Sequence, residues 1–251
     1  MNQANTQAAK TVLVTGGAKR IGAAIITRFH CVGFNVIIHC NYSLNQAQAL
    51  AAELNQQRKN SALVIQKDLS SPNASEELVR QTLAFTGRLD VLVNNASIFS
   101  RTDLSAFDAD EWDALFNTNV KAPLLLSLAS RAALERQEGA IINLTDIHAE
   151  RPLKGYAVYC QSKAALVMQT KALAVEFAPR VRVNAIAPGA IVWPEQENAL
   201  SDAAKQKIIA KTPLQRHGDP AFIAQAVLAL AQNSFITGQI LRVDGGRSIL
   251  S

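Results

Sequence analysis

The chain has 251 residues, of which 49% are hydrophobic and 18% charged, and its formal net charge is +5. This is enough apolar material for the core of one domain, and no apolar run approaches the roughly 18 residues that a membrane span needs. Basic residues are scattered and aromatic residues make up only 6% of the chain, which argues against a nucleic-acid-binding surface. We therefore predict one domain that attracts small anions and binds neither nucleic acid nor membrane.

The N-terminal residues and the cysteines indicate how the domain is organised. Residues 1–10 are polar and lack the apolar segment of a signal peptide, so we expect a flexible tail followed by one domain over residues 11–251. The three cysteines, at positions 31, 40 and 160, form neither a CxxC pair nor an even disulfide set. We predict reduced thiols, a cytoplasmic location and no metal centre.

Short β-branched runs alternate along the chain with longer segments of helical period. The runs predict strands at residues 11–15, 35–39, 62–66, 91–94, 140–145, 181–186 and 239–243. The longer segments predict helices that include residues 45–58, 75–86, 110–136 and 159–177. Strict alternation of seven strands with helices indicates an α/β fold, a doubly wound parallel sheet with helices on both faces. Because ligands of such sheets bind at the carboxyl ends of the strands, the residues after each strand form the candidate site.

The first predicted strand runs into a glycine-rich turn, Thr15-Gly16-Gly17-Ala18-Lys19-Arg20-Ile21-Gly22. Glycines at a strand-to-helix turn let a pyrophosphate approach the backbone and rest against the N-terminus of the helix. Tight turns also need glycine for their own geometry, but this turn has the strand before it and the helix after it that a dinucleotide site requires. We predict that Gly16, Lys19, Arg20 and Ile21 contact a dinucleotide.

The second predicted strand lacks the acidic residue that NAD-preferring enzymes usually carry near its end. His39, Asn41 and Ser43 can instead donate hydrogen bonds, and the two basic residues of the glycine turn supply positive charge for a 2′-phosphate. The pattern favours NADPH as the cofactor.

Polar residues also follow the third and fourth predicted strands. Asp68, followed by Leu69, could accept a hydrogen bond from the adenine amino group, and the fourth strand continues into Asn95, Ala96 and Ser97. Each segment alone is typical of turns. Their order, each at the end of a strand, supports the dinucleotide site.

Tyr159 and Lys163 lie four residues apart, on one face of a predicted helix, and Asp146 lies thirteen residues before the tyrosine. A tyrosine acts as an acid near neutrality only if its pKa falls from about 10, and a nearby cation would lower it. A carboxylate beside the pair would oppose that shift, so Asp146 needs a chemical explanation.

Taken in order, these motifs resemble the short-chain dehydrogenase/reductase family over essentially the whole chain; Asn119, the Pro188-Gly189 pair and the closing Asp244-Gly245-Gly246 add to the resemblance. It implies a Rossmann-type, single-domain, NADP-binding reductase, often a homotetramer. Tyr159 would donate the proton, Lys163 would hold the nicotinamide ribose and Asn119 would order a water relay. The implied cofactor-binding residues are Gly16, Lys19, Arg20, Ile21, His39, Asn41, Tyr42, Ser43, Asp68, Leu69, Asn95, Ala96, Ser97, Leu144, Tyr159, Lys163, Pro188, Gly189, Ala190 and Ile191.

Two departures from the usual family pattern point to the substrate. Arg20 replaces a glycine of the turn, and Asp146 replaces the usual serine; with Ser97 and Phe99 they resemble the pteridine reductase branch. In that branch the arginine contacts pyrophosphate and pterin, the aromatic residue stacks on the pterin, and the aspartate joins the tyrosine in proton delivery. Tyr42 differs from the pteridine reductase branch, which often has a basic residue at this position.

The chemistry of the two candidate substrates differs at Asp146. In ketone reduction negative charge builds on oxygen, and an ionised carboxylate about 4 Å away would oppose it by roughly 4 kcal/mol at an effective dielectric of 20. In a dihydropterin the hydride goes to a C=N carbon and the proton to nitrogen, so Asp146 and Tyr159 could act as a coupled relay. The predicted substrate site is Arg20, Ser97, Phe99, Asp146, Tyr159 and, as a lid, Trp193.

Several alternatives stay open. Asp146 could be only a helix cap, and Phe99 only a core aromatic. The chain could reduce an acyl thioester or a small ketone, although it lacks the serine for this, or it could sense NADPH without catalysis. Which pterin or folate is preferred does not follow from the sequence.

Overall fold

The computed structural model describes residues 9–193 and 199–250. Seven strands form one sheet in the order β3-β2-β1-β4-β5-β6-β7, and every neighbouring pair is parallel. This confirms the predicted fold class, and each strand begins and ends within two residues of its predicted position. The strands are β1 (Thr11–Val14), β2 (Asn35–Cys40), β3 (Ala62–Gln66), β4 (Val91–Asn94), β5 (Ala140–Leu144), β6 (Arg182–Pro188) and β7 (Ile240–Val243).

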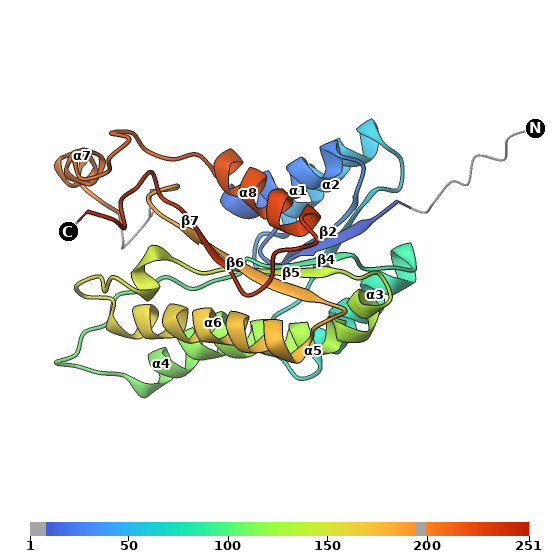
Figure 1. Cartoon of the computed structure of the whole chain (residues 1–251), viewed down its shortest axis with the longest axis horizontal. Helices are drawn as coiled ribbons and strands as arrows, with labels where there is room; N and C mark the ends of the chain where they lie inside the picture. Colours follow the sequence, from blue (N-terminus) through green and yellow to red (C-terminus); the bar gives the residue numbers. More distant parts are fainter. Residues whose placement is uncertain (1–8, 194–198, 251) are drawn as a thin grey trace, which may run out of the picture.

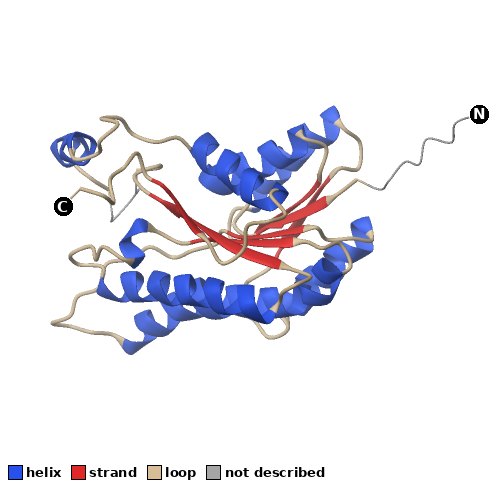
Figure 2. Cartoon of the chain, viewed as in Figure 1, coloured by secondary structure: helices blue, strands red, loops and turns tan. Residues whose placement is uncertain are grey.

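Helices cover both faces of the sheet (Figures 1 and 2). One layer consists of α1 (Arg20–Cys31), α2 (Leu44–Gln57) and α8 (Pro220–Gln232). The other consists of α3 (Ala74–Thr86), α4 (Ala109–Phe116), α5 (Ala122–Glu135) and α6 (Ala157–Glu176). A short helix, α7 (Asp202–Ala210), lies at one end of the molecule, close to the C-terminus.

The strands are buried on both faces because their side chains alternate between two apolar clusters. Val12 and Val14 of β1 pack with α1 and α8, whereas Leu13 packs with α3, α5 and α6. Among the described helices, none has both the length and the apolar character needed to cross a bilayer. The predicted tail, residues 1–10, lies mostly outside the described residues, although the Lys10 carbonyl already accepts a hydrogen bond of 2.7 Å from the Asn35 amide.

The single helix predicted for residues 110–136 is wrong in one respect. A π-helical turn, η1 (Asn117–Lys121), separates α4 from α5. Two local features favour this insertion. Pro123 has no N–H to donate to the Asn119 carbonyl in an α-helical pattern, and the Asn119 side chain is held by residues outside the helix. Residue spacing does not reveal such a turn, because apolar periodicity continues on both sides of it.

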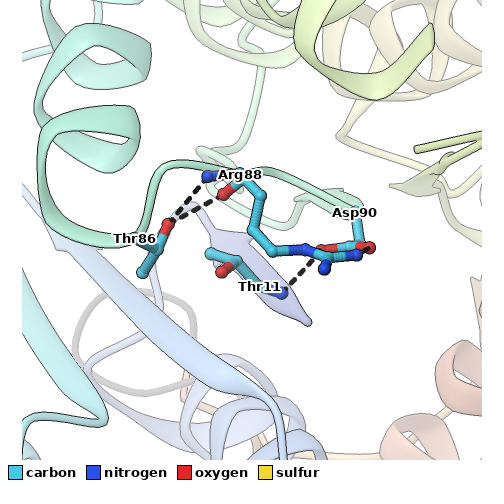
Figure 3. A network of polar contacts seen from close by, with 4 residues as sticks. All are labelled: Thr11, Thr86, Arg88 and Asp90. Carbon is cyan, nitrogen blue, oxygen red and sulfur yellow. Dashed lines mark hydrogen bonds and ion pairs between the residues drawn. The ribbon is translucent and has the colours of Figure 1, made fainter. Parts of the chain in front are cut away.

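A polar network joins the amino ends of the central strands β1 and β4 (Figure 3). The Asp90 carboxylate accepts two hydrogen bonds from the Arg88 guanidinium, at 2.6 and 2.9 Å, and one from the Thr11 amide at 2.8 Å. The Arg88 and Asp90 side chains are only 15% and 8% exposed. Three donors converge on one buried carboxylate, which fixes where the two central strands begin.

Replacement of Asp90 by alanine should therefore lower the free energy of unfolding by about 2–3 kcal/mol, because the Thr11 amide and the Arg88 guanidinium lose a buried acceptor. Urea titration measures this. The matched control is Glu77→Ala, which removes a partly exposed carboxylate paired with Arg80 and should have a much smaller effect. Equal effects of the two substitutions would show that burial of the Asp90 network does not stabilise the fold.

Candidate active site

A cavity of about 830 Å³ opens at the carboxyl ends of the strands, where the strand order reverses between β1 and β4. Parallel doubly wound sheets bind ligands at this position. The loops after β1, β2, β4, β5 and β6 all contribute to its wall. The predicted cofactor residues that line it are Gly16, Lys19, Arg20, Ile21, Asn41, Ser43, Asn95, Ala96, Ser97, Leu144, Tyr159, Lys163, Pro188, Gly189, Ala190 and Ile191.

The glycine turn is closed tightly on itself. A Cβ atom at Gly22 would lie 2.1 Å from the Gly16 carbonyl oxygen, so only glycine fits there. The Asn95 side chain donates to the carbonyls of Thr15, at 2.9 Å, and Gly16, at 3.1 Å. The Thr15 hydroxyl in turn accepts from the amides of Asn95 and Ala96. Thr15, which was not among the predicted site residues, thus ties the turn after β1 to the loop after β4.

Arg20 lies in the left-handed backbone region, with φ of +55°, which explains why the family usually has glycine at this position. Its guanidinium donates a hydrogen bond of 2.7 Å to the Trp193 carbonyl, across the cavity. The Trp193 ring lies against His217, with ring centroids 4.2 Å apart. The turn after β1 and the loop after β6 are therefore connected through one arginine.

His39 has a different role from the predicted one. Its ring is buried, Nδ1 lies 3.2 Å from the Gly16 amide, and Nε2 lies 2.8 Å from the Lys67 carbonyl. Because the Gly16 N–H can only donate, Nδ1 must be the acceptor and Nε2 must carry the proton. Burial also lowers the pKa of His39, which favours this neutral form. His39 supports the glycine turn and has no donor left for a phosphate.

Three further predicted cofactor residues do not line the cavity, namely Tyr42, Asp68 and Leu69. The Tyr42 side chain is 93% exposed. Asp68 is also exposed, and it accepts hydrogen bonds from the backbone and the hydroxyl of Ser70, which lower the pKa of its carboxyl. Leu69 packs instead against the apolar cluster under α3, α5 and α6. Asn41 and Ser43 are the residues after β2 that reach the cavity.

Asn119 is 1% exposed and lies behind the cavity wall. Its amide donates to the Ile98 carbonyl and the Ser162 hydroxyl, both at 3.0 Å. Its side-chain oxygen accepts from the Ile98 amide at 2.9 Å and the Ser97 hydroxyl at 3.1 Å. Every polar atom of this side chain is used to join the loop after β4 to α6, so only its backbone carbonyl remains for the predicted water relay.

Tyr159 and Asp146 are in direct contact. The phenol donates a hydrogen bond of 2.7 Å to Asp146 Oδ2, while Oδ1 accepts one of 2.8 Å from the His148 amide. The second contact caps the short 3₁₀ helix η2 (Ile147–Ala149). Asp146 is therefore both a helix cap and a partner of the tyrosine, and the two interpretations of this residue are compatible.

The pKa of Tyr159 is shifted in the direction opposite to the predicted one. Burial and the adjacent Asp146 carboxylate raise the pKa of Tyr159 well above its ordinary value. The predicted lowering by Lys163 is absent, because Nζ donates to the Leu144 carbonyl at 2.9 Å and lies 5.7 Å from the centre of the tyrosine ring. Burial lowers the pKa of Lys163 itself to about 8, against the attraction of Asp146.

Aromatic rings form one wall of the cavity. Phe99 stacks on Tyr156, with centroids 4.5 Å apart and planes 16° apart, and meets Tyr159 edge-on at 4.8 Å. Phe99 also packs against the small apolar cluster that includes Leu115. It is therefore a packing residue that also lines the cavity, where a flat ring could lie against it.

The cavity wall contains three basic residues that were not predicted from the sequence, namely Arg101, Lys154 and Arg247. Arg101 lies over the Tyr156 ring, 5.2 Å from its centroid. No pattern of spacing indicates these residues, because they come from three loops far apart in the chain. Only the folded arrangement of these loops brings their positive charge to the cavity.

Comparisons with known proteins agree with this geometry. A family model described as enoyl-(acyl carrier protein) reductase matches residues 16–248. The 3-oxoacyl-[acyl-carrier-protein] reductase FabG of Staphylococcus epidermidis is 35% identical, over 94% of this chain and 98% of the relative. Pteridine reductase 1 of Leishmania tarentolae is 34% identical, over 96% of this chain and 97% of the relative.

Two solved structures also match along nearly the whole chain. FolM alternative dihydrofolate reductase 1 from Brucella suis, in complex with NADP, is 37% identical with a TM-score of 0.90, over 96% of both chains. Its counterpart from Brucella canis, also complexed with NADP, is 37% identical with a TM-score of 0.87, over 96% of this chain and 95% of that one. The chain is therefore an oxidoreductase of the short-chain dehydrogenase/reductase family.

Proposed function

We propose that the chain is an NADPH-dependent reductase of a pterin C=N bond, converting a dihydropterin or dihydrofolate to its tetrahydro form. The observation that carries this proposal is the 2.7 Å hydrogen bond from Tyr159 to Asp146. A carboxylate in contact with the proton donor hinders ketone reduction but gives the N–H groups of a pterin an acceptor. The similarity to a pteridine reductase and to two alternative dihydrofolate reductases supports the same substrate class.

The residues at the β1 end of the cavity fit NADPH. Ile21 and Gly22, in the first turn of α1, line the cavity where a pyrophosphate would rest, and Lys19 and Arg20 supply positive charge beside it. Asn41 and Ser43 offer hydrogen-bond donors after β2, where no carboxylate lines the cavity. Both Brucella relatives bind NADP. When bound, the cofactor would supply the hydride.

The proton step follows from the pair of side chains. Loss of the Tyr159 proton beside an ionised carboxylate is unfavourable, as the raised pKa of the phenol indicates. In the step, the pterin nitrogen takes one proton from the hydrogen-bonded Tyr159–Asp146 pair, which titrates as a unit. The His148 amide stabilises the charge left on the pair.

A ketoreductase is the second candidate, and a specific observation favours it. The FabG relatives match this chain as well as the pteridine reductase does, at 35% and 34% identity. Against it stands Asp146, in the position where the family usually has serine. Substrate comparison separates the two functions.

We further propose that the chain assembles as a homotetramer. Four large apolar side chains are exposed on α5 and α6, namely Leu125, Leu128, Met168 and Val175. A second group lies on or near β7 and the C-terminus, namely Phe235, Leu241, Ile249 and Leu250. Two apolar faces on different sides of one chain support an assembly with two kinds of contact.

The substrate class can be tested with one panel. NADPH oxidation should be followed with dihydrobiopterin, dihydrofolate and an acetoacetyl thioester under identical conditions. We expect turnover of at least one pterin at a kcat/KM at least tenfold above that of the thioester. Turnover of the thioester alone would contradict the pterin function, and NADPH binding without any turnover would support a sensor.

Asp146→Ser should reduce pterin turnover by about 100-fold, because the tyrosine loses its proton partner. Serine is also a good helix cap, so η2 and NADPH affinity should be little changed. Asp146→Asn is the matched control for shape, since it can keep the cap but cannot exchange a proton, and should be as slow as the serine variant. A pterin rate in either variant close to the original would remove Asp146 from the proton step.

The lowered pKa of Lys163 predicts a pH dependence of cofactor affinity. A lysine with a pKa of about 8 loses its charge as pH rises through that value, and with it the charged contact to the nicotinamide ribose. We expect NADPH affinity to fall by about tenfold between pH 7 and pH 9, measured by fluorescence titration. In Lys163→Arg the charge persists across this range, so the affinity of that variant should be flat. A flat profile in the original protein would contradict the assignment.

A further inference from the structure

A second, smaller cavity adjoins the catalytic one. It has a volume of about 480 Å³ and lies between the segment after β5 and the C-terminal segment. His148 and Arg247 line both cavities, so the two spaces meet beside Asp146. The smaller space is strongly basic, because Arg151 and Lys211 also line it. Its one carboxylate, Glu150, is paired with Arg242.

Arg247 is held at this junction by its backbone. Its amide donates to the Asp244 carbonyl at 3.2 Å, and its carbonyl accepts from the Arg151 guanidinium at 3.2 Å. The first contact closes a tight turn after β7, and the second ties this turn to the segment after β5. The fold thus fixes the backbone from which the Arg247 side chain reaches the cavity wall.

The guanidinium of Arg247 has no hydrogen bond or ion pair with residues 9–193 or 199–250. The two carboxylates whose charge acts on Arg247 accept hydrogen bonds from other groups. Asp244 accepts from the amides of Gly246 and Ser248, and Asp146 accepts from the His148 amide and from Tyr159. Burial lowers the pKa of Arg247, and this effect is larger than the opposite effect of the Asp146 and Asp244 charges. A half-buried cation without a direct partner is costly unless a ligand supplies the anion.

The charges of the proposed ligands indicate which group supplies the anion for Arg247. Lys19 and Arg20, at the β1 end of the cavity, would hold the phosphates of NADPH. A pterin ring is neutral and would contact Asp146 and Tyr159. Neither leaves an anion for Arg247, whereas a carboxylate matches the planar fork of a guanidinium with two parallel hydrogen bonds.

We propose that Arg247 binds a carboxylate in the tail of the substrate, so that the enzyme selects folate-type pterins, which carry a glutamate, over compact pterins. This inference rests on the proposed pterin reductase function. The adjoining basic cavity would give the tail a place to lie, and the positive charge of Arg151 and Lys211, which line it, would attract the outer carboxylate.

The test is the ratio of kcat/KM for dihydrofolate to kcat/KM for dihydrobiopterin, measured at saturating NADPH. Arg247→Gln should lower this ratio by at least tenfold, mainly through the KM for dihydrofolate. Arg80→Gln removes the same charge from the exposed face of α3 and should leave the ratio unchanged. In case Arg247→Gln does not fold, the ratio in the original protein should fall when salt is raised from about 0.05 to 0.5 M, because salt screens the tail charge.

The outcomes separate the two hypotheses. Equal losses for both substrates would place Arg247 at the shared ring and overturn the inference, as would an unchanged ratio both in the variant and with salt. Reduction of dihydrobiopterin but not dihydrofolate by the original protein would overturn the inference and leave the pterin function standing. Turnover of the acetoacetyl thioester alone would remove the pterin function, and the inference with it.

Discussion

The hydrogen bond between Tyr159 and Asp146 constrains most of the candidate site. It joins the loop after β5 to the first turn of α6, and it fixes the remaining carboxylate oxygen on the His148 amide. Because the phenol is buried beside this carboxylate, it is a weaker acid than the same phenol beside a cation alone. In the proposed function the substrate benefits from the carboxylate, as an imine-like C=N bond would and a ketone would not.

Around this pair, the loops are held by side chains that do not line the cavity. His39 uses both ring nitrogens to support the glycine turn, and Asn119 uses its whole amide to join the loop after β4 to α6. Such residues contain polar groups suited to a cofactor, yet their donors and acceptors are already paired. What they contribute is the position of the backbone that the ligand would meet.

The strands were predictable because a buried parallel strand must be apolar along its whole length, and their order in the chain placed the cavity. Because the carboxyl ends of the strands meet at this cavity, the residues predicted there line it, among them Gly16, Arg20, Asp146, Tyr159 and Lys163. The direction of side chains within loops was not predictable. Tyr42 and Asp68 follow strands as expected but turn to solvent, and Arg247 reaches the cavity through a turn near the other end of the chain.

The π-helical turn lets α4 and α5, which it separates, change in sequence independently of each other. One inserted residue rotates everything after it by about 100° around the helix axis. Leu115 of α4 therefore faces the aromatic cluster under the candidate substrate site, whereas Leu126 and Leu134 of α5 face the sheet. Changes on α4 that reshape the pocket need not disturb the packing of α5, so substrate preference can diverge while the scaffold stays the same.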